Sequence, residues 1–208
     1  MQIFLAEKLV LYAVPKTGST ALEAALRSRC SIELPHKSGH RHISASDFQR
    51  IWAPFLKSTY GFEGEGFAVI RDPLERLGSW YRYRRRLDPS NNPRSTRNMT
   101  FDEFLEADLS GDVKFSKFVG NQRVFVSDER GRICVTHLFA YDAFSEAVAF
   151  LRERFNKSLN VEQVNVSPEQ KLNPSLELIG RVREARVDEF ALYDRVAESG
   201  YLHTPAAG

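Results

Sequence analysis

The feature that most limits how this chain folds is a continuous apolar run at residues 9–14, followed at once by a turn that contains Pro15 and Gly18. A run that is apolar at every position predicts a strand buried on both faces, which is typical of a central strand in a parallel sheet. In residues 20–29 the apolar side chains recur at helical spacing, so we expect a helix after the turn. Strand, glycine turn and helix form the opening unit of an α/β fold.

The same unit returns further along the chain. A second apolar run at residues 67–70 precedes Arg71-Asp72-Pro73 and a segment of helical spacing, and Pro73 suits a first helical turn because its missing N–H is not needed there. Thr100 and Glu103 have the spacing of a capping box, which predicts another helix start.

The second half of the chain continues the alternation. A third apolar run at residues 133–140 precedes Asp142, a good N-cap for a helix that reaches Phe155. Residues 161–166 are a candidate fourth strand, and residues 175–198 are expected to form one long amphipathic helix. The pattern as a whole predicts one domain over residues 1–208, with a three-layer parallel sheet flanked by helices.

Composition limits the class of partner. The chain has 208 residues, and its 29 Lys and Arg against 27 Asp and Glu give a net charge of +2, so general attraction to nucleic acid or membranes is not expected. Residues 66–100 nevertheless hold eight arginines against three acids, so anion binding is expected from local clustering. The two cysteines have no disulfide or metal spacing. No apolar stretch approaches the roughly 20 residues of a membrane span, which favours a cytoplasmic protein.

The first turn has the residues of a phosphate site. It reads Pro15-Lys16-Thr17-Gly18-Ser19-Thr20. Gly18 lets the backbone approach a ligand, and the N–H groups of the helix start, with the hydroxyls of Thr17, Ser19 and Thr20, suit a phosphate beside the Lys16 cation. A capped helix start with a solvated lysine is the structural alternative. A nucleotide triphosphatase loop requires Gly five residues before Gly18 and Lys directly after it, where this chain has Ala13 and Ser19.

This turn resembles the loop that binds the 5′-phosphosulfate of PAPS (3′-phosphoadenosine 5′-phosphosulfate) in sulfotransferases. The chain as a whole resembles the carbohydrate-type enzymes of sulfotransferase family 2. Residues 70–81 are similar to that family's 3′-phosphate motif, in which an arginine ends a strand and a serine follows eight residues later, here Arg71 and Ser79. The resemblance implies a P-loop-like sulfotransferase fold in which residues 15–20 hold the 5′-phosphate while Arg71 and Ser79 hold the 3′-phosphate. Alternatively, Arg71 pairs with Asp72 or Glu75 and Ser79 only packs.

The activity that the resemblance implies is transfer of the sulfuryl group from PAPS to a hydroxyl of an acceptor such as a carbohydrate. Such an in-line transfer depends on positioning and electrostatic stabilisation, and the resemblance places Lys16 at the leaving oxygen. The resemblance implies no metal, and the sequence shows no His, Cys or carboxylate cluster with ligand spacing. Nucleic acid is not an expected partner.

A hydroxyl acceptor also needs a general base. Three histidines crowd the loop after the first helix, and imidazole has the side-chain pKa nearest neutrality. We rank His42 first, His40 second and His36 third, with surface histidines as the alternative reading. The carboxylates Glu63 and Glu65, just before the second apolar run, compete for the role.

Two other functions remain open at this point. One is a nucleotide-dependent kinase of related fold, with Asp72 as a metal residue. The other is a binding module that keeps a nucleotide or anionic-glycan pocket without turnover. The basic run of residues 81–98, with six arginines and one acid, is either a solvated face or a surface that gathers PAPS or an anionic acceptor.

Overall fold

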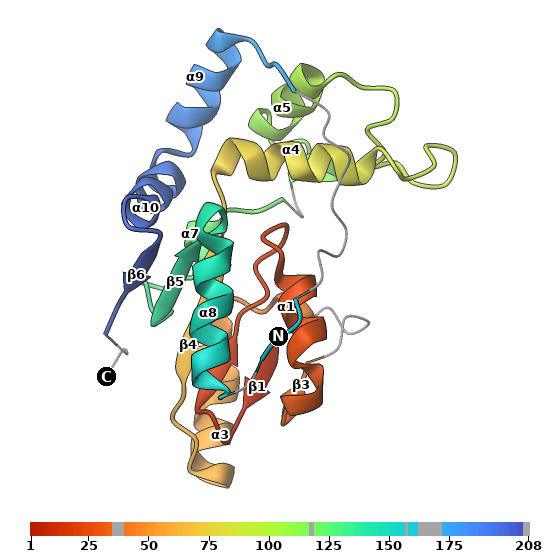
Figure 1. Cartoon of the computed structure of the whole chain (residues 1–208). Coiled ribbons are helices and arrows are strands. Elements are labelled where there is room, and N and C mark those ends of the chain that lie inside the picture. The colour runs from red at the N-terminus through yellow and green to blue at the C-terminus, as the bar shows by residue number, and fades with distance from the viewer. Residues whose placement is uncertain (35–39, 117–118, 157, 162–171, 206–208) are drawn as a thin grey trace.

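A six-stranded sheet runs through the molecule, with helices on both faces (Figure 1). The computed structural model describes residues 1–34, 40–116, 119–156, 158–161 and 172–205. The strand order is β3-β1-β2-β4-β5-β6. The strands are β1 (Gln2–Phe4), β2 (Leu9–Leu11), β3 (Ile32–Glu33), β4 (Glu65–Ile70), β5 (His137–Ala140) and β6 (Tyr201–His203). The prediction of an α/β sheet flanked by helices is confirmed.

The sheet is mixed, so the expectation of an all-parallel sheet is wrong. Only β2, β4 and β5 form the parallel centre, whereas β1 is antiparallel to both β2 and β3, and β6 is antiparallel to β5. β1 and β2 are joined by a short turn between Phe4 and Leu9, and strands joined in this way can only run antiparallel. The first apolar run therefore enters the sheet as the second strand of a hairpin.

Helices connect the strands and continue beyond them. They are α1 (Ser19–Leu26), η1 (Arg27–Arg29), η3 (His40–His42), α2 (Ala45–Asp47), the π-helical turn η4 (Phe48–Trp52), α3 (Ala53–Tyr60), α4 (Pro73–Arg84), α5 (Phe101–Leu109), α6 (Val113–Ser116), α7 (Gln122–Phe125), η5 (Tyr141–Ala143), α8 (Phe144–Arg154), α9 (Leu176–Ala185) and α10 (Val187–Ala197). The expected capping box at Thr100 and Glu103 is present at the start of α5.

Two expectations about helix ends are wrong. Residues 175–198 form two helices rather than one, because Arg186 leaves the helical conformation with φ −123° and ψ 28°. Asp142 does not cap α8, whose N-cap is Ala143; its carboxylate instead accepts a hydrogen bond from the Tyr193 hydroxyl at 2.6 Å. The candidate strand at 161–166 falls almost wholly outside the described residues, which omit 162–171.

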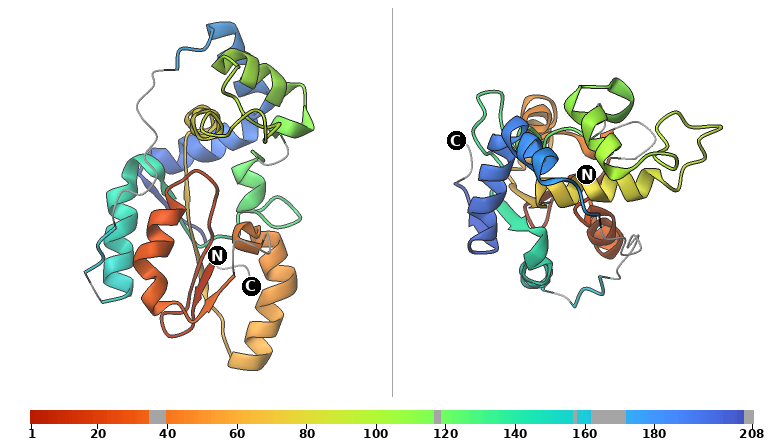
Figure 2. Two further views of the ribbon diagram at one scale, coloured as in Figure 1. Left: turned by 90° about the vertical axis from the view of Figure 1, so that its right-hand side faces the viewer. Right: turned by 90° about the horizontal axis from the view of Figure 1, so that it is seen from above.

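Apolar packing explains the layers. Leu22 and Leu26 of α1, with Leu151 of α8, pack against one face of the sheet. Phe48 and Leu56, from the η4–α3 segment, pack against the other face together with α10. Figure 2 shows α1 and α8 on one side of the sheet and α3 on the other. Burying both faces requires strands that are apolar throughout, as the sequence pattern of β2 and β4 predicts.

A separate apolar cluster joins α4, α5 and α9 beyond one end of the sheet. It includes Leu77 and Tyr81 of α4, Phe104 of α5 and Val182 of α9, all buried. Figures 1 and 2 show α4 lying across the end of the sheet, with α5 and α9 beside it. The residues that follow β2 and β4 therefore lie at the end of the sheet that α4 crosses.

Candidate functional site

Three segments meet at the carboxyl edge of the parallel strands. Residues 15–20 follow β2, Arg71 follows β4 and Tyr141 follows β5. Because β2, β4 and β5 are neighbours and run the same way, their carboxyl ends lie side by side. Ligands of open α/β sheets bind at this edge. The fold thus brings together the two sequence motifs, residues 15–20 and 70–81, which are fifty positions apart in the sequence.

The turn after β2 has an unusual backbone. Lys16 and Gly18 both lie in the left-handed region, with φ of 70° and 77°. Gly18 is the N-cap of α1, and the first N–H groups of a helix have no partner within it. The Thr17 hydroxyl is buried and donates to the Val14 carbonyl at 2.9 Å, so it closes the turn, while the Thr20 hydroxyl accepts from Arg41 at 2.7 Å. The Thr17 hydroxyl therefore does not serve an anion, whereas the Thr20 hydroxyl keeps its own O–H as a donor beside the backbone N–H groups and Lys16.

Tyr141 joins the two motifs. A Cβ atom at Gly18 would lie 2.8 Å from the Phe144 ring and 3.3 Å from the Tyr141 ring, so both rings press against this glycine. The guanidinium carbon of Arg71 lies 4.5 Å from the centre of the same Tyr141 ring. One aromatic side chain thus contacts both the turn of residues 15–20 and the arginine after β4.

Lys16 faces helix α4. Its ammonium nitrogen lies 4.2 Å from the centre of the Tyr83 ring and 5.5 Å from that of Trp80. Ser79 is buried and precedes Tyr83 by four residues, which places it on the same side of the helix. Arg82 lies one turn after Ser79 on α4, and Arg86 follows in the turn directly after the helix, where its N–H donates to the Tyr83 carbonyl at 3.2 Å.

The electrostatics of the site favour an anion. The pKa of Lys16 is lowered to about 8, first by burial and then by the positive charges of Arg86, Arg71 and Arg82. The Glu75 carboxylate, 3.3 Å from Arg71 and 3.9 Å from Arg82, offsets one of these four positive charges, so the cluster keeps a net positive charge that a bound anion would offset. Strongly perturbed groups in such clusters are typical of functional sites.

The basic run has two parts. Arg84 is buried, donates to the Phe115 carbonyl at 3.0 Å and lies over the rings of Trp80 and Phe104, so a solvated face is the wrong description for it. The positive charges of Arg82 and Arg86, in contrast, help to lower the pKa of Lys16. Only part of the run therefore lies close enough to Lys16 to affect its charge.

A family model described as the sulfotransferase family (family 2) matches residues 3–192. The chain belongs to the sulfotransferase family. Comparison with curated proteins and with solved structures gives no match. The resemblance seen in the two motifs is thereby confirmed at the level of the family, and membership supports sulfotransfer, with a hydroxyl-bearing acceptor, as the activity.

Two further observations concern partners. In the parts of the chain that the structure describes, no helix combines the length and apolarity needed to cross a membrane. Within the same described ranges, no three His, Cys, Asp or Glu side chains gather in a way that could hold a metal ion.

Of the three candidate histidines in this sulfotransferase, His42 lies beside the turn. Its Nδ1 is 2.6 Å from the Ala13 carbonyl, and since a carbonyl only accepts, Nδ1 donates and the neutral ring carries its lone pair on Nε2. Burial lowers the pKa of His42, and the positive charge of Arg41 adds to this. The backbone of His40 belongs to η3, but its side chain lies outside what the structure describes, as does the whole of His36.

The proposed glutamates lie at the wrong end of the sheet. Glu65 begins β4, whereas Arg71 follows the end of that strand, a separation of about 20 Å at some 3.3 Å per residue. Glu65 pairs with Arg154 and with His137, and Glu63 pairs with Lys57. The suggestion that either carboxylate is the base is therefore wrong.

Sequence reasoning missed Tyr141, although a signal was present. Tyr141 directly follows the third apolar run, at the same sheet edge as Arg71. Using that signal required knowing that β4 and β5 are neighbours.

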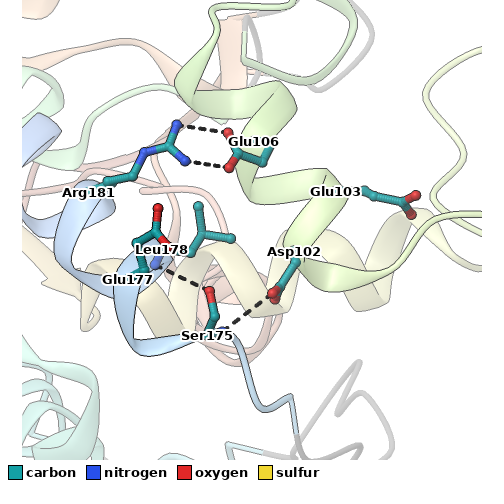
Figure 3. A pocket seen from close by; sticks show the side chains of 7 residues that line it. All are labelled: Asp102, Glu103, Glu106, Ser175, Glu177, Leu178 and Arg181. Atoms are coloured by element: carbon teal, nitrogen blue, oxygen red, sulfur yellow. Dashed lines mark hydrogen bonds and ion pairs between the residues drawn. The ribbon is translucent and has the colours of Figure 1, made fainter.

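A hollow between α5 and α9 is acidic, whereas the site around Lys16 is basic (Figure 3). Four carboxylates line it, together with Ser175, Leu178 and Arg181. Glu106 pairs with Arg181, and Asp102 accepts from the Ser175 N–H at 3.4 Å, so these groups hold the two helices together. Its charge excludes it as a site for an anionic donor.

Proposed function

We propose that this sulfotransferase transfers the sulfuryl group of PAPS to a hydroxyl of an acceptor, of which carbohydrates are the class that the motifs favour. The observation that carries the proposal is the meeting of the two phosphate motifs at one sheet edge, with Tyr141 against both Gly18 and Arg71. Members of this family generally use PAPS as the sulfate donor. A donor with phosphate groups at two ends suits two cationic positions.

The residues present fit this donor. The turn of residues 15–20 offers the N–H groups of Ser19 and Thr20 and the Lys16 ammonium to the 5′-phosphosulfate, in the manner of a P-loop. Arg71 and Ser79 would hold the 3′-phosphate, as the family motif implies. The repulsion that lowers the pKa of Lys16 is relieved when a polyanion enters.

Lys16 also suits the chemical step. The acceptor oxygen forms a bond to sulfur while the bond from sulfur to the bridging oxygen breaks, which leaves adenosine 3′,5′-bisphosphate. Negative charge grows on the bridging oxygen, and an ammonium held beside it stabilises that charge. Burial of Lys16 strengthens this interaction because the local dielectric is low.

His42 is the base that we favour, with His40 second. The acceptor hydroxyl must lose its proton, and a neutral imidazole with Nδ1 donating to Ala13 has Nε2 as its basic atom. The lowered pKa of His42 keeps the ring neutral near pH 7. The carbonyl of Ala13, next to the phosphate turn, would thus fix the ring orientation.

The proposal treats residues 1–208 as one catalytic domain. In support, β1 near the start of the chain and β6 near its end belong to one sheet. A kinase with Asp72 as a metal residue is less well supported, because the Asp72 carboxylate caps α4 by accepting from the Glu75 N–H at 2.9 Å. A binding module without turnover remains an outcome of the test below.

The test measures nucleotide binding first and sulfuryl transfer second. We expect the protein to bind adenosine 3′,5′-bisphosphate and to move radiolabelled sulfate from PAPS to a panel of hydroxyl acceptors, and Lys16→Ala and Arg71→Ala to weaken binding. Arg181→Ala, at the acidic hollow, is the matched control. Binding without transfer indicates the non-catalytic module, magnesium-dependent ATP binding indicates the kinase, and absence of nucleotide binding overturns the proposal.

A further inference from the structure

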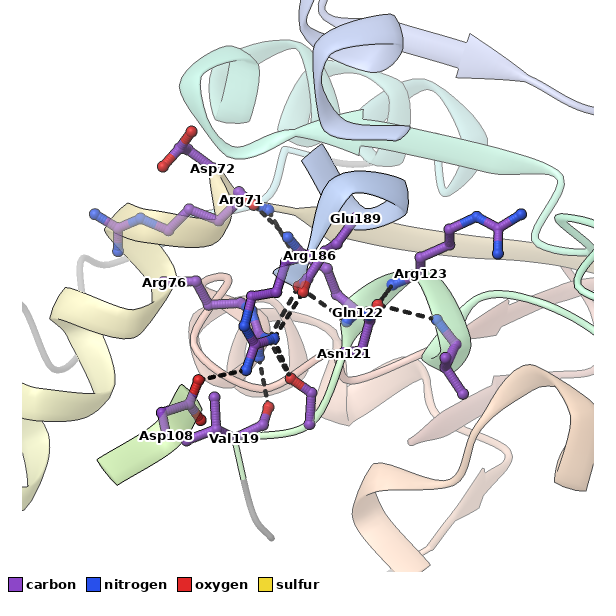
Figure 4. Close-up of polar contacts among 12 residues, drawn as sticks. Arg71, Asp72, Arg76, Asp108, Val119, Asn121, Gln122, Arg123, Arg186 and Glu189 are labelled. Carbon is purple, nitrogen blue, oxygen red and sulfur yellow. Dashed lines mark hydrogen bonds and ion pairs between the residues drawn. The ribbon is translucent and has the colours of Figure 1, made fainter. Parts of the chain in front are cut away.

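Gln122 holds the main chain of Arg71. Its Oε1 accepts from the Arg71 N–H at 3.0 Å, and its Nε2 donates to the Arg71 carbonyl (Figure 4). A carboxamide has one donor side and one acceptor side, so it pairs with a residue as a neighbouring strand would. Gln122 is only 1% exposed, so water does not compete for these bonds.

Arg71 stands where the sheet no longer fixes the chain. The paired part of β4 ends at Ile70, opposite Ala140, and the chain turns into α4 at Pro73. The peptide groups of Arg71 therefore lie beyond the ladder of β4 and β5. Gln122 supplies the missing partners, and this sets the direction in which the Arg71 side chain leaves the backbone.

Gln122 is itself held by a buried carboxylate. Its N–H donates to Glu189 Oε1 at 3.0 Å, and the same oxygen accepts from Arg76 at 3.0 Å. The other oxygen of Glu189 accepts from Arg186 at 2.8 Å. Arg76 and Glu189 are 1% and 0% exposed, so α4 and α10 are tied to the start of α7 inside the protein (Figure 4).

Arg76 also holds the segment of chain that precedes Gln122. It donates to the carbonyls of Val119 and Gly120, both at 2.8 Å, just before α7 begins. The side chain of Asn121 caps α7 by accepting from the N–H groups of Arg123 and Val124. Gln122 thus has little freedom to leave Arg71.

We propose that Gln122 is a positioning residue for Arg71, and that it thereby sets the preference of the site for a nucleotide with a 3′-phosphate. This inference rests on the proposed function for its ligand. Gln122 fixes the backbone of Arg71, while Tyr141 at 4.5 Å and Glu75 at 3.3 Å guide the guanidinium. An arginine whose backbone and guanidinium are both held in place loses little conformational entropy when it binds a phosphate.

The test compares two nucleotides that differ only in the 3′-phosphate. In Gln122→Met, adenosine 3′,5′-bisphosphate should bind about tenfold more weakly, whereas adenosine 5′-phosphate should keep its affinity. A general loss of structure would weaken both equally. In an Arg71→Ala background, Gln122→Met should cause no further loss, because the two residues act as one unit. Equal weakening of both nucleotides, or full additivity with Arg71→Ala, would overturn the inference.

Gln2→Met is the matched control. Gln2 is also a fully buried glutamine, and its Nε2 donates a hydrogen bond to a main-chain carbonyl, that of Glu23, at 2.9 Å. It lies in β1, however, away from Arg71. It should leave the ratio of the two affinities unchanged. If Gln122→Met does not fold, Gln122→Asn keeps an uncharged carboxamide but shortens its reach by one methylene, so the paired hydrogen bonds to Arg71 are lost and the same loss of preference is expected.

A second measurement does not depend on nucleotide. Amide hydrogen exchange in the free protein should show a protected Arg71 N–H, with protection lost in Gln122→Met and kept in Gln2→Met. Unchanged protection in Gln122→Met overturns the positioning role even if PAPS is the donor. Conversely, if the wild-type protein binds neither nucleotide, the proposed function and the phosphate preference fail, while loss of protection still supports the contact with Arg71.

Discussion

The Lys16 ammonium lies over the Tyr83 ring, 4.2 Å from its centre, where the turn of residues 15–20 meets helix α4. The aromatic face attracts the cation, while burial and the charges of Arg71, Arg82 and Arg86 oppose it and lower the pKa of Lys16 to about 8. The charge on Lys16 therefore depends on whether an anion shares the site.

We predict that nucleotide binding takes up protons above pH 8. With a pKa of about 8, Lys16 in the free protein becomes increasingly neutral above that pH, and a bound polyanion raises its pKa and restores the charge. Affinity should accordingly fall as the pH rises through 8. Calorimetric titration with adenosine 3′,5′-bisphosphate, in buffers of different ionisation enthalpy, measures this uptake. Lys16→Arg, which stays charged, should abolish it; an undiminished uptake in that variant would assign the proton to another group.

Gly18→Ala should destabilise the fold more than Gly111→Ala. Both glycines have positive φ, 77° and 75°, so alanine costs about 1–2 kcal/mol of backbone strain at either place. A Cβ at Gly18 would also lie 2.8 Å from the Phe144 ring, whereas nothing lies within 4 Å of one at Gly111. The additional overpacking should cost roughly 1–3 kcal/mol, measured by urea denaturation. Equal losses in the two variants would mean that Phe144 moves aside freely.

Local patterns explain which parts of the fold were predictable from sequence. The runs at 9–14 and 67–70 indicate buried strands because they are apolar throughout, and Thr100 with Glu103 defines a helix start within four residues. β1 covers only three residues, too few for a periodic pattern, so the hairpin and the mixed sheet were missed. Nothing in the amphipathic pattern marks the break at Arg186, which coincides with its buried pairs to Asp108 and Glu189.

The candidate site divides in the same way. Lys16, Gly18 and Arg71 stand in short motifs that directly follow apolar runs, so the sequence alone indicates them. Gln122 and Glu189 reach Arg71 and Arg76 across 51 and 113 positions, and such contacts leave no local pattern. The position of Glu65 was also readable from sequence, because it stands at the amino end of the β4 run, whereas ligands of such sheets bind beyond the carboxyl ends.

Replacing His42 by Ala should slow sulfuryl transfer by roughly 10²–10⁴-fold, the usual contribution of a general base, and leave nucleotide affinity intact. The wild-type rate should be flat near neutral pH and fall in acid, because the pKa of His42 lies below its ordinary value of 6.5 and protonation removes the base. The pH profile of labelled-sulfate transfer measures both. His203→Ala, an exposed histidine on β6, is the control. A rate in His42→Ala that matches this control would transfer the role to His40.

Glu189→Gln should destabilise the protein by about 3–5 kcal/mol, because it leaves the buried guanidinium of Arg76 without its counter-charge. The change preserves the shape of the side chain, so lost packing does not contribute. The matched control is Glu106→Gln, which removes the same charge from the exposed pair with Arg181 and should have a far smaller effect. Urea denaturation midpoints of the two variants, at equal m-values, measure the difference. Similar midpoints would mean that Arg76 finds other partners, such as the carbonyls of Val119 and Gly120 that it already contacts.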